Sequence, residues 1–330
     1  MGRYEDLETL LRGLDAGDQR ALARAITLAE SGEGAPLVRR IFDRTGRAMT
    51  IGLTGPPGVG KSTLSSALVR RYRELGKRVG VVSVDPSSPF SHGALLGDRI
   101  RLAEHFTDDG VFIRSMASRG HLGGLAGATG DAVLLMDAFG MDVILIETVG
   151  VGQSEIEIAQ LAQTTVVALQ PGSGDSIQVL KAGIMEIADI FVVNKADHPM
   201  ASHLRREIRS MMEMLHFPGW VPEVVTTQAI SGEGIAELVA AIERHAAYLR
   251  ESGELQERRR AAMAHRVRQL AVGRVERAVA RLLPAALASG DDPYAATDRL
   301  LQMLDPRDVP AEAPEPAVPA PVRAVVKGLA

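Results

Sequence analysis

The sequence predicts an α/β domain of the doubly wound type, with a mainly parallel sheet and helical extensions at both ends of the chain. Between residues 49 and 230, short runs rich in Val, Ile and Leu alternate with stretches of helical periodicity, which is the element order of a parallel sheet. Several runs are almost continuously apolar, as expected for strands that helices cover on both faces. A glycine-rich loop joins the first run to the first helix of this region.

Residues 1–45 predict a helical extension that precedes the sheet. Asp18 is placed to cap a helix that runs to about Glu30, and apolar side chains recur on one face of that helix. These side chains are Leu22, Ile26 and Ala29. Pro36 can occupy the first turn of a second, shorter helix that ends near Phe42.

Residues 46–248 predict the sheet and the helices that cover it. We expect strands at 49–54, 78–84, 111–116, 142–147, 165–170, 190–194 and 223–227. We expect helices at 63–75, 130–139, 177–187 and 202–215. In such a sheet the loops that follow the strands gather at one edge, where doubly wound folds bind their ligands.

Residues 249–305 predict a helical arm. The stretch 250–281 is dense in Arg, Glu and Ala, and its apolar residues recur at helical spacing: Met263, Val267, Leu270 and Val275. An apolar stripe of this length needs a surface to cover, on its own domain or on a second subunit, and we expect a homodimer. Residues 306–330 are Pro-rich, and we expect them to be disordered because they cannot bury enough apolar area.

The composition excludes several classes of protein. Apolar residues make up 46% of the 330, which is ordinary for a globular chain, and the formal net charge is −4 with no dominant basic stripe. We therefore expect no nucleic-acid partner. No apolar run reaches the roughly 18 residues of a membrane helix, so we expect no membrane partner either. Cysteine is absent, and no secretion signal opens the chain, which favours the cytoplasm.

Residues 55–62 match the phosphate-binding pattern G-x-x-x-x-G-K-S, between a predicted strand and a predicted helix. In such a loop the backbone N–H groups bind phosphate oxygens, and the helix dipole adds to the attraction. Lys61 would reach the outer phosphates, and the Ser62 hydroxyl would hold Mg²⁺. The predicted nucleotide-contacting residues are Gly55, Pro57, Gly58, Val59, Gly60, Lys61, Ser62 and Thr63.

A second pattern indicates a guanine nucleotide. Asn194-Lys195-Ala196-Asp197 follows a buried strand, and the Asp197 carboxylate can accept hydrogen bonds from guanine N1–H and the exocyclic amine. The Lys195 stem can lie over the base, while Asn194 can tie this loop to the phosphate loop. Farther along, Ala229 is the candidate backbone N–H donor to guanine O6.

Candidate residues for magnesium binding and catalysis lie at the end of the predicted strand 142–147 and just after it. Glu147 is placed to bind Mg²⁺ through water, and Gly150 can give its N–H to the γ-phosphate. Val151 stands where many G proteins have a water-orienting Gln, which predicts slow intrinsic hydrolysis; Gln153, two residues on, is a further catalytic candidate. Asp85 can assist Mg²⁺ or the attacking water, although a plain Asp-Pro turn is the alternative.

These stretches together resemble the MeaB-like (ArgK-type) GTPases that accompany methylmalonyl-CoA mutase. The matching segments include 55–63, 84–88, 147–155, 170–175, 194–197 and 290–296, and the resemblance spans roughly residues 5–305. It implies a dimeric G protein that guards a B12-dependent acyl-CoA mutase, gates adenosylcobalamin loading and helps eject damaged cofactor with GTP. By position it assigns phosphate, Mg²⁺ and switch functions to Lys61, Ser62, Asp85, Asp98, Glu147 and Gly150. It places Arg101 and Lys181 in moving switches.

Three alternatives stay open from the residues. A metallochaperone GTPase of the nickel-insertion type usually carries a Cys- or His-rich motif, which a chain without cysteine does not offer. A small-molecule kinase shares the phosphate loop, but it usually needs a lid with catalytic arginines. An interaction protein with a degenerate nucleotide site is disfavoured by intact Lys61, Ser62 and Asp197.

Overall fold

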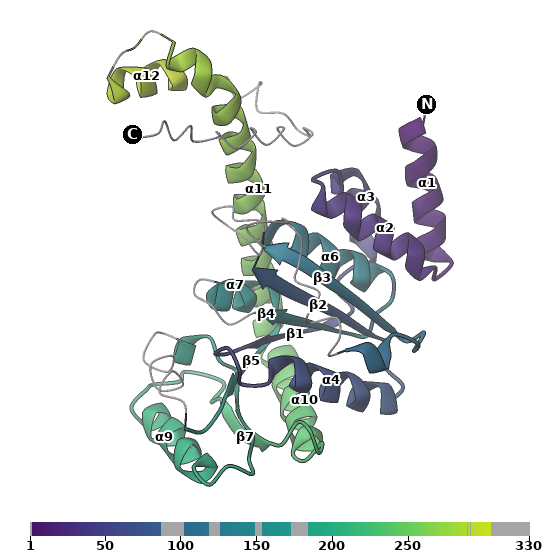
Figure 1. The fold of residues 1–330 in the computed structure, drawn as a ribbon, viewed down its shortest axis with the longest axis vertical. Helices are drawn as coiled ribbons and strands as arrows, with labels where there is room; N and C mark the ends of the chain where they lie inside the picture. The colour runs from purple at the N-terminus through teal and green to yellow at the C-terminus, as the bar shows by residue number, and fades with distance from the viewer. Residues whose placement is uncertain are drawn as a thin grey trace, which may run out of the picture.

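The computed structural model describes residues 2–86, 102–118, 126–148, 154–172, 184–288, 290 and 292–304. Within these ranges the chain forms a seven-stranded sheet in the order β3-β2-β4-β1-β5-β6-β7, with every neighbouring pair parallel (Figure 1). The strands are β1 Met49–Thr54, β2 Val79–Pro86, β3 Val111–Ser118, β4 Val143–Thr148, β5 Thr164–Leu169, β6 Ile190–Asn194 and β7 Glu223–Thr227. The predicted α/β fold is confirmed.

The central strands show why their sequences are almost continuously apolar. Every residue of β4, β5 and β6 is buried, because helices cover both faces of the sheet. β1 lies at the centre of the sheet, between β4 and β5. β2, β3 and β4 lie on one side of β1, and β5, β6 and β7 lie on the other side. The carboxyl end of β1 is therefore at a point where strand order reverses, which is where doubly wound folds bind ligands.

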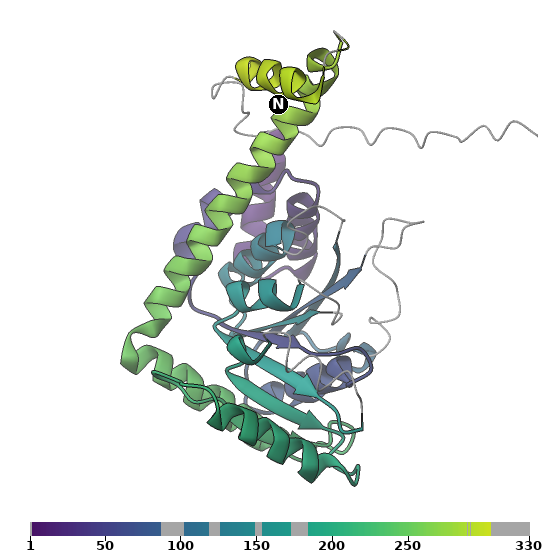
Figure 2. The ribbon, with the colours of Figure 1, turned by 90° about the vertical axis from the view of Figure 1, so that its left-hand side faces the viewer.

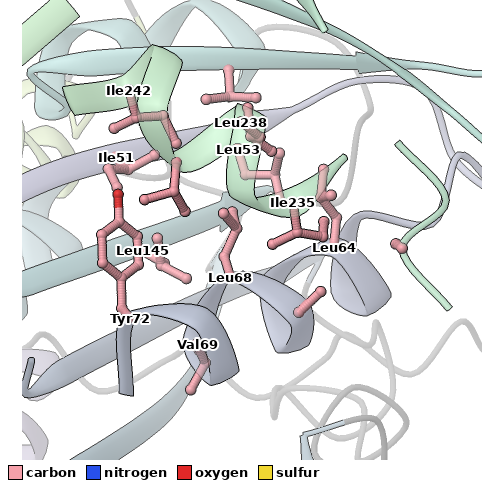
Figure 3. Close-up of a cluster of buried hydrophobic side chains, with 14 of the residues drawn as sticks. Ile51, Leu53, Leu64, Leu68, Val69, Tyr72, Leu145, Ile235, Leu238 and Ile242 are labelled. Carbon is pink, nitrogen blue, oxygen red and sulfur yellow. The ribbon is translucent and has the colours of Figure 1, made fainter. Parts of the chain in front are cut away.

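Two helices cover one face of the sheet. α4 (Lys61–Glu74) packs on β1, β2 and β4, whereas α10 (Ile235–Ser252) packs beside α4 on β5, β6 and β7. Apolar side chains of both helices belong to one core cluster (Figure 3). The cluster includes Ile51, Leu53, Leu64, Leu68, Leu145, Leu238 and Ile242. α4 thus begins directly beside the carboxyl end of β1 and is held there by buried aliphatic contacts.

The opposite face is covered by α6 (Ala126–Ala138) and α7 (Ser154–Leu161), which share a second core cluster with the N-terminal extension. That extension contains α1 (Gly2–Asp15), α2 (Gln19–Glu30), α3 (Ala35–Ile41) and the 3-10 turn η1 (Phe42–Arg44). As predicted, the Asp18 side chain accepts a hydrogen bond from the Arg20 N–H and caps α2. Leu22 and Ile26 are fully buried, so the extension packs as part of the sheet's own core.

α9 (Ala201–Glu213), close to its predicted bounds, packs on β6 and β7 and buries Leu204 and Ile208. The helix expected at 177–187 lies mainly outside the described residues, and its described end, Ile184–Glu186, is the 3-10 turn η3. A further 3-10 turn, η2 (Ala103–His105), precedes β3.

The boundary expected between the sheet region and the C-terminal arm, at residues 248 and 249, falls within α10. This helix continues to Ser252 and buries Leu249. Gly253, with φ at 82°, separates it from α11 (Glu254–Ala286), a 33-residue helix that runs along the domain and projects past it (Figure 2). α12 (Pro293–Met303) packs on the far end of α11. No helix in the described ranges is both long and apolar enough to span a membrane.

Candidate nucleotide-binding site

The loop between β1 and α4 has the backbone shape of a phosphate-binding loop. Gly55, Gly58 and Gly60 have φ angles of 139°, 78° and 92°, which residues with side chains rarely adopt. A Cβ atom on Gly55 would also lie 2.0 Å from the Ala168 carbonyl oxygen. The loop leads into the first turn of α4, whose N–H groups and dipole favour an anion.

Lys61 is the first residue of α4, and its side chain turns back into the loop. Its Nζ atom donates hydrogen bonds to the carbonyl oxygens of Gly55 at 2.7 Å and Pro56 at 3.0 Å. Because the residue is buried, its positive charge is held within the loop. An ammonium group in this position can form charge-assisted hydrogen bonds to phosphate oxygens that the loop binds.

Glu147 lies opposite the first turn of α4, at the carboxyl end of β4. Its carboxylate accepts hydrogen bonds from the Ser62 hydroxyl at 2.7 Å and from the Ser65 hydroxyl at 2.8 Å. All three residues are buried. Ser65 was not predicted, although its position three residues after Ser62 places it on the same face of the helix.

The Ser62 and Glu147 oxygens fit the chemistry of Mg²⁺. Magnesium prefers oxygen ligands and is usually held by one or two protein groups together with waters and substrate phosphates. Ser62 Oγ and Glu147 Oε1 lie together beside the phosphate loop, so these two residues would hold the metal ion of a bound nucleotide. Elsewhere in the described part of the chain, no three His, Cys, Asp or Glu residues gather as a metal site.

Asn194 joins the predicted base-reading loop to the phosphate loop. Its Nδ2 atom donates to the Val59 carbonyl at 2.8 Å, as the sequence predicted. Its Oδ1 atom accepts from the Thr227 hydroxyl at 3.1 Å and from the Ala229 N–H at 3.2 Å. The residue is buried, so one amide side chain fixes three loops at the carboxyl edge of the sheet.

Lys195 makes a second connection between the same loops. Its φ angle of 59° is left-handed, which turns the chain sharply after β6. Nζ donates to the Gly58 carbonyl at 3.0 Å and to the Gln170 side-chain oxygen at 2.5 Å. The aliphatic stem of Lys195 is thereby stretched across the edge of the phosphate loop. Gln170 was not predicted in this role, because only the fold brings the end of β5 beside β6.

Asp197 and Ala229 are the two residues that would read the base edge. Asp197 is exposed, and no residue in the described ranges donates a hydrogen bond to its carboxylate. Ala229 is buried, and its N–H is directed at Asn194. A contact from Ala229 to guanine O6 stays a prediction, and it would require that N–H to be shared or released by Asn194.

Asp85 lies within a strand and not in a turn. β2 continues through Pro86, and Asp85 and Pro86 pair with Ala117 and Ser118 of β3. The Asp-Pro turn interpretation is therefore wrong: the strand extends because β3 provides a partner along its full length. The backbone of Asp85 reaches the carboxyl edge of the sheet, close to the predicted site.

The other predicted switch and catalytic residues lie outside the described ranges. They are Asp98, Arg101, Gly150, Gln153 and Lys181. Their assignments remain predictions. The structure thus brings together the phosphate loop, the magnesium candidates Ser62 and Glu147, and the base-reading loop, which come from three separate strand ends.

A phosphate loop after the first strand, held to an Asn-Lys-x-Asp loop by the asparagine, is the arrangement of a P-loop GTPase. Comparison with protein families makes the assignment specific. The chain belongs to the family described as methylmalonyl-CoA mutase-associated GTPase MeaB, whose profile matches residues 22–282. The family expected from the sequence is confirmed.

Individual relatives agree with this assignment. A candidate GTPase of Pyrococcus horikoshii is 44% identical over 313 residues, which cover 91% of this chain and 99% of that protein. The mouse protein named methylmalonic aciduria type A homolog, mitochondrial, is 37% identical over 274 residues, covering 77% of this chain and 66% of its own. Among solved structures, a LAO/AO transport system kinase has a TM-score of 0.70 at 28% identity, covering 92% of this chain and 99% of that one.

Proposed function

We propose that this protein binds GTP and GDP with Mg²⁺, hydrolyses GTP, and acts as a chaperone of a B12-dependent acyl-CoA mutase. In this role it would gate the delivery of adenosylcobalamin and protect or reactivate the mutase. The observation that carries nucleotide binding is the bond from Asn194 to Val59, which makes the phosphate loop and the base-reading loop one site. The mutase as client rests on membership of the MeaB family.

Each nucleotide group has a matching protein group in the proposed site. Lys61 and the loop N–H groups would hold the phosphates, and the exposed Asp197 carboxylate would accept from the guanine edge. Ser62 and Glu147 would hold Mg²⁺, which neutralises charge on the outer phosphates when it is bound. A carboxylate that accepts from guanine N1–H and the amine discriminates against adenine, because that edge offers no matching donors.

For hydrolysis we assign catalytic roles to Lys61, Asp85, Glu147, Gly150 and Gln153. Lys61 would stabilise charge on the phosphates, and Gly150 would donate its N–H to the γ-phosphate. Asp85 or Gln153 would orient the attacking water, since Val151 offers no polar group for this purpose. A site that lacks a fixed water-orienting group predicts a slow basal rate, which a docked partner can raise.

A homodimer through the arm is part of the proposal. Within the described ranges, only Ala278 and Ala286 of α11 are buried, whereas several large apolar side chains are more than 40% exposed. These are Met263, Val267, Leu270, Val272, Val275 and Leu283. An exposed apolar stripe on a helix that projects past its domain supports a partner surface, and a second copy of the arm offers a self-complementary one.

The family assignment favours this function over a nickel-insertion metallochaperone or a small-molecule kinase. The kinase activity is printed in the name of one solved relative and is said of that protein alone. The cytoplasm remains our expectation for the location of this chain.

The deciding assay is GTP turnover with and without each candidate acyl-CoA mutase from the same organism. We expect slow turnover alone and a stimulation of tenfold or more by one mutase, which corresponds to about 1.4 kcal/mol of added transition-state stabilisation. A parallel assay would follow cobalamin transfer to that mutase in GDP, GTP and a non-hydrolysable analogue. Absence of stimulation by every mutase, with transfer independent of nucleotide, would contradict the chaperone role.

A further inference from the structure

A pocket of about 280 Å³ lies at the amino edge of the sheet, opposite the nucleotide loops. One wall comes from the segment that enters β1, at Arg47 and Met49, and from Gln163 just before β5. The other wall comes from the last turn of α10 and the first turns of α11. The pocket therefore lies at the joint between the nucleotide domain and the arm.

The lining combines positive charge with an apolar floor. Arg47, Arg250 and Arg259 line the pocket, and no acidic residue of the described ranges does. The floor is formed by Ala48, Met49, Ala246, Leu249 and Leu255. This concentration of one charge sign is unexpected for a chain with 41 acidic and 37 basic residues. Three arginines beside apolar residues make a lining of the kind that suits an anion with a carbon chain.

The arginines of the pocket differ from other arginines of α10 and α11 in their ion pairs with carboxylates. Arg244, Arg258 and Arg266, on the same two helices, each form an ion pair with a carboxylate. Among the described residues, Arg47 and Arg250 form no such pair. The Arg259 guanidinium donates to the Gly46 carbonyl at 2.7 Å, which fixes it beside the pocket without neutralising its charge.

We propose that this pocket binds a small organic dianion, with carboxylate or phosphate groups on a short carbon chain. Arginine forks bind either group through paired charge-assisted hydrogen bonds. The volume of about 280 Å³ lies just below the ~300–1,000 Å³ of most ligand pockets, which suits a molecule of a few carbon atoms and excludes a whole nucleotide.

Binding there would connect two parts of the fold. Arg47 belongs to the segment that enters β1, whereas Arg250 and Arg259 lie on either side of Gly253, where the chain turns from α10 into α11. A dianion held by all three would fix the start of the arm against the sheet. Since it would bind only the folded joint, it would also raise the stability of the whole protein.

The test is calorimetric titration of the full-length protein with succinate, glycerol 2-phosphate and inorganic phosphate at constant ionic strength. Saturating GDP and Mg²⁺ are present throughout, so that the phosphate loop cannot supply the binding. We expect saturable binding of one probe molecule per chain. Binding of succinate alone, of glycerol 2-phosphate alone or of both probes would support the proposal. Which of them binds would identify the anionic group that the pocket prefers.

Variants separate the pocket from general surface charge. The double variant Arg47→Gln with Arg250→Gln should lower the affinity at least tenfold, while Arg260→Gln, which removes an exposed α11 arginine outside the pocket, should change it less than twofold. GDP affinity should be unchanged in all variants, so a failure here leaves the proposed GTPase function standing. No saturable binding of any probe, binding of inorganic phosphate alone, or an equal loss in Arg260→Gln would overturn the proposal.

Discussion

Lys61 is the residue on which we expect the phosphate affinity of the proposed site to depend most. Its ammonium group lies inside the loop, 2.7 Å and 3.0 Å from the Gly55 and Pro56 carbonyl oxygens, and would exchange these bonds for phosphate oxygens. Hydrogen bonds to charged groups contribute about 1.5–3 kcal/mol. We therefore expect Lys61→Ala to lower GDP affinity by about 10- to 100-fold in calorimetric titration. Unchanged affinity in a folded Lys61→Ala variant would show that the loop does not bind the phosphates.

Ser65 positions Glu147 without being a predicted metal ligand. It supplies one of the two α4 hydroxyls that hold the Glu147 carboxylate, and it is fully buried. Ser65→Ala removes one hydrogen bond of about 1 kcal/mol, so the apparent Mg²⁺ affinity of the GDP complex should fall about fivefold. GDP affinity measured in EDTA should stay the same.

Ser66→Ala is the matched control for Ser65. Its hydroxyl faces away from Glu147, toward Glu104 and His105, with His105 Nε2 at 2.9 Å. That variant should leave the magnesium dependence unchanged. If both serines had the same effect on Mg²⁺ affinity, the loss would report general loosening of α4 and not the orientation of Glu147.

At the scale of elements, two carboxylates, the buried Asp189 and the partly buried Asp131, hold α11 against the domain. Asp189, which precedes β6, accepts from both terminal nitrogens of Arg258 on α11, and its backbone carbonyl accepts from Trp220. His245 Nε2 lies 3.2 Å from Asp189 Oδ1. Farther along the arm, Arg266 donates to Asp131 of α6 at 2.6 Å.

The two carboxylates differ in the direction of their pKa shifts. Burial works to raise the pKa of Asp189, but hydrogen bonds and charge from His245 and Arg258 outweigh it and lower that pKa below its ordinary value. Burial raises the pKa of Asp131 despite Arg266. A lowered carboxyl pKa stabilises the fold above the unfolded pKa of about 4, and this contribution is lost as pH falls through the lower folded pKa.

We expect Asp189→Asn to lower the free energy of unfolding at pH 7 by about 3 kcal/mol, because it leaves Arg258 without its buried counter-charge. Urea denaturation followed by the fluorescence of Trp220, the single tryptophan, would measure this directly. The difference from the wild type should shrink below pH 4. Asp131→Asn is the control and should cost much less, since burial already disfavours the charged form. Equal costs at pH 7 would contradict the assigned roles.

The sequence was sufficient to predict those elements whose conformation depends on residues close together in the chain. The phosphate loop and the central strands were predicted because their glycines and apolar runs determine their own conformation. Contacts between distant segments could not be predicted: Gln170 meets Lys195, and Asp189 meets Arg258, only after the sheet has formed. The expected boundary at residue 249 falls within α10, because the sequence pattern alone does not show that Leu249 is buried and that the helix ends at Ser252.

At the scale of the whole molecule, we expect the exposed apolar stripe of α11 to form the interface of the proposed dimer. Val267 is 57% exposed and Leu270 is 46% exposed. Placing two carboxylates there, in Val267→Glu with Leu270→Glu, should desolvate charge in a dimer interface and give monomers. Light scattering should show the wild type as a dimer and the variant at half its mass, with unchanged GDP affinity. A monomeric wild type would mean that the stripe has another partner.

We propose that the phosphate loop and the base-reading loop form one guanine-nucleotide site in which Asp197 reads the base. The most direct measurement is calorimetric affinity for GTP, ATP and xanthosine triphosphate in the wild type and in Asp197→Asn. We predict that the wild type prefers GTP strongly over ATP, because adenine leaves the Asp197 carboxylate unpaired. Asp197→Asn should weaken GTP binding and favour xanthosine triphosphate. Equal affinity of the wild type for ATP and GTP, or no change of preference in Asp197→Asn, would contradict it.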